Sequence, residues 1–306
     1  MVIALASALL VGQKPTTQES LKDRGYIAAK FATSSGGVTV YLPNDIAPGD
    51  QISGTIFTDS NSDALKNLQV FIGDVLGSQP NLRSAQRRWL VPTTARDGYP
   101  LIVRDKSGRQ IGAMRIPISA APGKLDAYTF PSFMQVGRPS VIWGPFDGDS
   151  SNTKLKLKDS DMSVLAESPR SIVVYVPYDS PIGKSSAVLV ENQMQAKADI
   201  RAISIELTSG KSELKKNEST TVSIKVDGIA GLNEATVPYI RVQNLTPNIL
   251  DLEGQEIHVL IPTVSSSGTY QKDFKALSKE AGPFLITTFV EPGQGTPVLP
   301  SKISAN

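Results

Sequence analysis

The sequence predicts a mainly β chain built from tandem β-sandwich domains. Short segments alternate apolar and polar residues, which is the pattern of half-buried strands. Turn-forming residues separate these segments, and the chain holds 24 Gly and 21 Pro. Its 306 residues exceed the usual size of one domain, and its 40% hydrophobic content suffices for folded cores. Many short strands divided by turns are typical of β-sandwiches.

The first predicted sandwich covers residues 38–122. Residues 38–42 and 51–57 combine alternation with β-branched side chains, and the turn formers at 47–50 separate them. The same signals predict further strands at 68–72, 89–91, 101–103 and 111–118.

Two more sandwiches are predicted at 123–205 and 206–292, because strand patterns recur in blocks of similar length. Strands of the second block are expected at 141–143, 153–157, 163–165, 171–176 and 187–190. Strands of the third block are expected at 219–226, 237–242, 257–261 and 284–290. Within 270–279, Phe274 and Leu277 lie three residues apart, which predicts one short helix. An irregular loop with a strand is the alternative.

The two ends of the chain differ from its body. Residues 2–11 are uncharged and apolar but too few for a membrane span of about 20 residues. We therefore interpret residues 1–12 as a truncated signal peptide, with an element added to the first domain as the alternative. Residues 13–37 are expected to be a leader or linker, and 293–306 a flexible tail. This predicts a secreted, periplasmic or cell-surface protein without a transmembrane segment.

The composition excludes several classes of site. The absence of Cys excludes disulfides, thiolate nucleophiles and zinc–thiolate centres, and one His excludes sites that need two. A net charge of +2 provides no electrostatic footprint for nucleic acid. We expect no nucleic-acid partner and no cofactor.

One loop has the oxygen-rich pattern of a calcium site. Asp147 and Asp149 flank Gly148, and alternate positions of this loop carry oxygen ligands. Asn152 stands where calcium loops have Gly, and Lys158 where they have Glu. The pattern favours a tight turn whose carboxylates cap backbone N–H groups, with calcium binding as the alternative.

Three aromatic residues are candidate stacking platforms for a glycan, namely Trp89, Tyr99 and Trp143. Trp89 follows Arg87 and Arg88, and aromatic rings beside arginines can stack on bases or sugars. The favoured interpretation places Trp89 in the core and the arginines on a solvated face.

His258 is a candidate general base. In a strand it shares a face with Glu256, which could orient its ring. However, the chain lacks the nucleophile motif G-x-S-x-G. The favoured interpretation is a solvent-facing strand residue, so no catalytic residue is assigned.

Residues 138–200 resemble the immunoglobulin-like (Ig-like) IPT/TIG module of bacterial surface proteins. The resemblance rests on a Gly-Pro turn, a Ser-Pro turn before a strand and a Pro-to-Gly turn before the last strand, at 144–149, 166–170 and 181–183. It implies an Ig-like sandwich with an interaction or spacer role and no catalytic residues. Residues 47–55 are more weakly similar to bacterial Ig-like or carboxypeptidase-regulatory-like modules, which are also non-catalytic.

These observations predict a non-enzymatic secreted or surface protein that acts in structural spacing or protein interaction. Its partner would be a surface protein or a glycan. A carbohydrate-binding protein is the alternative, and a hydrolase is a more distant one.

Overall fold

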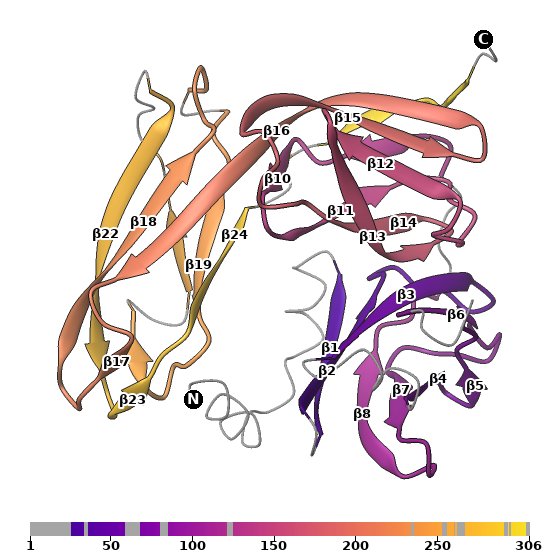
Figure 1. Ribbon diagram of the computed structural model, residues 1–306, viewed down its shortest axis with the longest axis horizontal. Coiled ribbons are helices and arrows are strands. Elements are labelled where there is room, and N and C mark those ends of the chain that lie inside the picture. Colours follow the sequence, from indigo (N-terminus) through magenta and orange to yellow (C-terminus); the bar gives the residue numbers. More distant parts are fainter. Residues whose placement is uncertain are drawn as a thin grey trace.

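The computed structural model describes residues 26–33, 36–58, 68–79, 85–120, 125–233, 236–252, 256–259, 261, 267–290, 293 and 295–303. Every regular element there is a strand, from β1 (Ile27–Thr33) to β26 (Ser301–Lys302). Figure 1 shows three β units, with the middle unit beside both others. The predicted fold class, mainly β with Ig-like sandwiches, is confirmed. No helix in the described segments is long and apolar enough to cross a membrane.

Two antiparallel sheets form the first unit. One sheet contains, in spatial order, β1, β2 (Gly36–Leu42), β3 (Gln51–Thr58) and β6 (Gln86–Leu90). The other contains β5 (Val75–Leu76), β4 (Gln69–Ile72), β7 (Tyr99–Arg104) and β8 (Gln110–Ile116). Alternate side chains of the longer strands, such as Val38, Val40 and Leu42, enter one buried cluster.

The prediction that residues 13–37 form a leader or linker is wrong for residues 26–33 and 36–37, which the structure describes. β1 pairs with β2 along its whole length. Ile27, Ala29 and Phe31 alternate into the first core, so this segment belongs to the fold. The 1–12 segment interpreted as a signal peptide lies outside the described residues.

The middle unit also has two sheets, and one strand contributes to both. The first sheet contains β9 (Tyr128–Phe130), β11 (Pro139–Trp143), β14 (Ser171–Tyr175) and β13 (Ser160–Ser168). The second contains β12 (Thr153–Leu157), β15 (Gly183–Glu191), β16 (Met194–Ser209) and β10 (Phe133–Gln135). The start of β13 pairs with β12, and a register shift between Val164 and Ala166 precedes the part that faces β3.

The third unit is built around the continuation of β16. Its larger sheet contains β16, β18 (Ser219–Asp227), β22 (Thr269–Ser278) and β20 (Leu250–Asp251). The opposing sheet contains β21 (Glu256–Val259), β19 (Ile240–Asn244) and β24 (Ile286–Val290). A short pair joins β17 (Glu213–Leu214) to β23 (Gly282–Pro283).

The short helix expected at 270–279 is wrong, because this segment is strand β22. Phe274, Ala276 and Ser278 are buried while Lys275 and Leu277 are exposed, which is a period of two. Leu277 is 44% exposed, so its spacing from Phe274 does not mark a common apolar face. The nine-residue register with β18 stabilises the strand.

The prediction that residues 293–306 form a flexible tail is also wrong for the described residues 295–303. β25 (Thr296–Val298) pairs with β9, and β26 pairs with the start of β16. The chain therefore returns from the third unit to the middle one, as the yellow strands beside β12 and β15 show in Figure 1.

The units are joined by β structure. β3 of the first unit pairs with β13 of the middle unit through Gly54 with Ala166 and Ser53 with Glu167. β16 runs without interruption from the middle unit into the third. The predicted boundary near 205 falls inside β16, where the core residues change from one cluster to the next. The division of the chain into three separate domains stays a prediction.

Candidate metal centre at the first junction

Three carboxylates from separate parts of the middle unit converge beside the first junction. Asp147 lies in the loop between β11 and β12, Glu167 in β13 and Glu191 at the end of β15. One oxygen of each lies within 4.8 Å of the other two. Glu167 is 0% and Glu191 3% exposed, while Asp147 is exposed. We call Asp147, Glu167 and Glu191 the carboxylate cluster.

The loop backbone is held by the buried members of the cluster. The Asp147 N–H donates to Glu191 Oε1 at 2.7 Å, and the Gly148 N–H donates to Glu167 Oε1 at 3.1 Å. Gly148 has φ +81°, a conformation that favours glycine. A Cβ on Gly148 would lie 2.2 Å from the carbonyl oxygen of Gln51 in the first unit. Only glycine therefore brings the loop this close to β3.

Hydrogen bonds fix the exposed member of the cluster. Asp147 Oδ1 accepts from the Asp149 N–H at 2.7 Å. Its Oδ2 accepts from the amides of Asn152 and Asn192 at 2.8 and 2.6 Å. The Tyr128 hydroxyl donates to Glu191 Oε2 at 2.6 Å.

Two oxygen atoms at the centre of this network form no well-aligned hydrogen bond with any of the described residues. They are Glu167 Oε2 and the hydroxyl Oγ1 of Thr153, which is 6% exposed. Thr153 pairs with Glu191 across β12 and β15, and its hydroxyl lies beside the Glu167 carboxyl. Unpaired buried polar atoms cost free energy, which a bound ion, a water molecule or a proton at this position would offset.

The pKa shifts of the three carboxyl groups reflect their burial and their closeness to one another. Burial raises the pKa of the Glu167 carboxyl to about 9, and the neighbouring Glu191 and Asp147 contribute to the rise. Burial likewise raises the pKa of Glu191. Burial alone would raise the pKa of Asp147, but hydrogen bonds from Asn152, the Asp149 N–H and Asn192 lower it. Within the described residues none of the three carboxylates forms an ion pair.

Asp149 points away from the cluster, although it lies two residues after Asp147. Its Oδ1 accepts from the N–H and hydroxyl of Ser151 at 3.0 and 2.7 Å, and Arg88 contacts the same oxygen at 2.5 Å. The capping of backbone N–H groups expected of both loop acids is observed. The two acids thus do not converge as the contiguous calcium-loop pattern requires.

The sequence alone did not identify Glu167 or Glu191 as site residues, although the position of Glu191 in its strand is unusual for a charged side chain. Glu191 continues the inward series of Ala187 and Leu189, where a charge is unexpected. Glu167 lies in the fully buried end of β13, between Ala166 and Ser168. The proximity of the two glutamates depends on strand register, which alternation does not reveal.

The candidate stacking platforms do not form one surface. Trp89 is 1% exposed, and its Nε1 donates to the Val70 carbonyl at 3.1 Å. Its assignment as a ligand platform is therefore wrong, and its expected place in the core is correct. Tyr99 is partly buried against the first core, whereas Trp143 lies on β11 of the middle unit. Arg87, expected on a solvated face, is instead 1% exposed.

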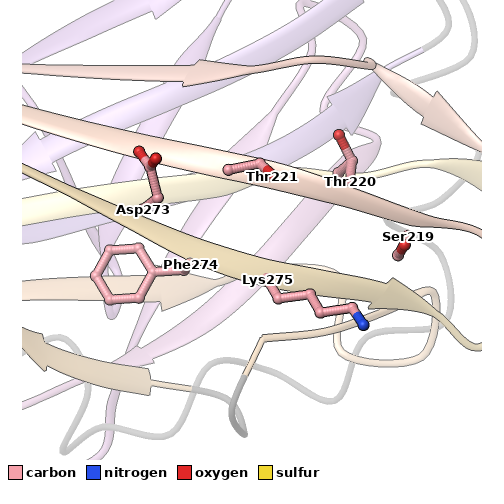
Figure 2. Close-up of a pocket in the computed structure, with 6 residues that line it drawn as sticks. All are labelled: Ser219, Thr220, Thr221, Asp273, Phe274 and Lys275. Carbon is pink, nitrogen blue, oxygen red and sulfur yellow. The ribbon is translucent and has the colours of Figure 1, made fainter.

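His258 lies on β21 with its side chain exposed and its ring 4.9 Å from that of Tyr239, between centroids. This is the solvent-facing position that the sequence favours. The third unit also has a hollow of about 540 Å³ over the paired strands β18 and β22. Figure 2 shows its lining, in which Asp273 and Lys275 are the charged residues. His258 does not line this hollow.

Comparisons with known proteins identify no family. No family model and no curated protein matches the chain. Among solved structures, SGBP-B of the Bacteroides ovatus mixed-linkage glucan utilization locus is 14% identical, with TM-score 0.26, over 80% of this chain and 73% of that one. The N-terminal domains of the bacteriophage RB49 outer capsid protein Hoc are 12% identical, with TM-score 0.21, over 90% and 96%. The Escherichia coli adhesin FdeC is 10% identical, with TM-score 0.21, over 92% and 100%. With TM-scores this low, no ligand or role is transferred from these proteins.

Proposed function

We propose that the chain is a non-enzymatic spacer and interaction protein that holds its Ig-like units in a fixed arrangement outside the cytoplasm. The observation that carries this proposal is the β structure at both junctions. β13 adds the middle unit to the sheet of the first, and β16 extends into the third. Tandem domains joined only by polar linkers are expected to move relative to one another, whereas strand pairing and a continuous strand connect these units.

The polar contacts of the first junction support a fixed geometry. Thr55 Oγ1 donates to the Leu165 carbonyl at 2.5 Å, and Ser53 Oγ donates to the Gly148 carbonyl at 3.2 Å. Arg170 is 5% exposed and contacts the carboxylates of Asp45 and Asp50 at 3.3 and 3.2 Å. Bonds of this kind have directional requirements, so they select one relative orientation.

The resemblance of residues 138–200 to IPT/TIG modules supports an interaction or spacer role. The uncharged apolar run at 2–11 supports export as the route to a secreted, periplasmic or surface location. A hydrolase is disfavoured because the two buried glutamates are closed to a sugar or peptide substrate.

Small-angle X-ray scattering of the full chain tests the proposal. A rigid arrangement predicts a profile that the single structure fits, with the same maximum dimension at low and high salt. A profile that requires an ensemble of unit orientations would contradict the spacer role.

A further inference from the structure

The geometry points to a calcium ion bound by Asp147, Glu167, Glu191 and Thr153, which locks the loop of the first junction in place. This site goes beyond the proposed function and does not depend on it. The loop that contains Asp147 contacts the first unit at Ser53, Gln51 and Arg88. An ion here would therefore act on the junction as well as on the middle unit.

The spacing of the oxygens suits calcium. Three atoms no more than 4.8 Å apart can all be reached from one point at about 2.8 Å or less. A small contraction gives the calcium–oxygen range of about 2.3–2.6 Å, whereas magnesium needs a much tighter octahedron near 2.1 Å. Zinc is disfavoured, because the donors are oxygens and the only His of the chain, His258, lies in the third unit.

A second observation, besides the acidic cluster, indicates a ligand. Glu167 is 0% exposed, and among the described residues its Oε2 accepts no well-aligned hydrogen bond, although its Oε1 accepts one from the Gly148 N–H. The hydroxyl of Thr153 is equally buried and unpartnered beside it. A cation would coordinate both atoms at once, and it would offset the negative charge that the three carboxylates bring together.

The ligand count and the access route are also compatible with calcium. Three carboxylates and one hydroxyl provide at least four oxygens, and a bidentate carboxylate adds another. Asp147 lies at the exposed edge, where water can complete the shell of six or more ligands. The ion would enter past Asp147 while Glu167 and Glu191 form the closed floor.

Calcium binding to the full chain, first stripped with chelator, is the direct test. Isothermal titration with CaCl2 should show one ion per chain, with a dissociation constant of about 0.1–1 mM, the weak extracellular class. Terbium should report the same site by luminescence excited through Tyr128, whose hydroxyl lies 2.6 Å from Glu191 Oε2. Calcium should displace the terbium, and magnesium should do so far less well.

Single substitutions distinguish calcium binding at this site from non-specific attraction of calcium to acidic residues. Glu167→Gln and Glu191→Gln keep the side-chain shape and should weaken calcium binding at least tenfold. Asp147→Asn, at the exposed edge, should do the same with little risk to folding. Asp149→Asn is the matched control from the same loop, and it should bind calcium as the parent does.

The melting temperature provides a second measurement. Calcium at 10 mM should raise that of the parent and of Asp149→Asn by several degrees, and that of Glu167→Gln by no more than about half as much. The absence of saturable binding to the parent at 10 mM calcium would overturn the proposal. Unchanged binding in both Glu167→Gln and Asp147→Asn would also overturn it.

Discussion

The two junctions of this chain are built differently. At the first junction two separate strands pair, and buried charges and hydroxyls surround them, among them Glu167, Arg170 and Ser53. At the second junction one strand, β16, continues through, and Arg201 Nη1 donates to the carbonyls of Gly228 and Ala230 at 2.8 and 2.9 Å. The side chains of Gln135 and Arg138 also donate to the hydroxyls of Thr288 and Thr287, at 3.2 and 3.1 Å. The first junction should therefore respond to charge and pH, and the second mainly to changes in β16.

Arg170→Ala should cause the largest loss. It removes the cation between Asp45 and Asp50, so both acids lose their ion-pair partner at a partly buried interface and keep only the hydrogen bonds from Ser119 and Ala47. We expect the free energy of unfolding to fall by about 4 kcal/mol, the usual cost of breaking a buried pair. Arg201→Ala, the matched change at the second junction, should cost only about 1–2 kcal/mol because it leaves neutral carbonyls behind. Urea unfolding measures both, and equal losses would contradict the contrast between the junctions.

Gly148→Ala should have the next largest effect. The added Cβ meets the Gln51 carbonyl at 2.2 Å and also occupies a positive φ. We expect a loss of about 3 kcal/mol from backbone strain together with overpacking. Gly108→Ala is the control, since Gly108 has φ +83° but nothing within 4 Å, and it should cost about 1 kcal/mol. A Gly148→Ala variant as stable as Gly108→Ala would show that the loop does not press against β3.

The pH dependence of the free energy of unfolding, measured in chelator, should show a difference of intermediate size. Burial raises the pKa of Glu167 to about 9 from an ordinary 4.5, so the native chain keeps a proton that the unfolded chain releases. Stability should then fall as pH rises between these two values. From about pH 5.5 to about pH 7 the parent should lose on the order of 2 kcal/mol more than Glu167→Gln, since Gln cannot titrate. Parallel pH profiles of the two proteins would contradict this.

His258→Ala should have the smallest effect. His258 is exposed on β21 and contacts the ring of Tyr239, so its removal should change stability by less than about 0.5 kcal/mol. The variant should behave as the parent in every binding assay. Loss of a measured hydrolytic activity at unchanged stability would instead support an enzyme.

Most of the body could be predicted from the sequence, because alternation directly reports which face of a strand is buried. The failures occurred where that signal was ambiguous. β1 contains three alanines, which contribute little to an apolar pattern, and β22 carries an exposed Leu277. The return of β25 to β9 could not be predicted either, since strand pairing over such a sequence distance leaves no local pattern.

The candidate site could be predicted only in part. The Asp147 loop is visible in the sequence because its acids flank a glycine. Its partners are 20 and 44 residues away, and they reach it through the register shift in β13 and the register of β15. Asp149, which the pattern treats as equivalent to Asp147, binds Arg88 instead.

The fixed arrangement of the units is tested most directly by distances across the two junctions. The chain has no Cys, so spin labels can be placed at exposed Lys106, Lys197 and Lys275 in the three units. Pulsed electron paramagnetic resonance should give one narrow distance distribution for 106–197 and another for 197–275. Arg170→Ala should broaden only the first of these. A broad 106–197 distribution in the parent would contradict a rigid first junction and, with it, the proposed spacer function.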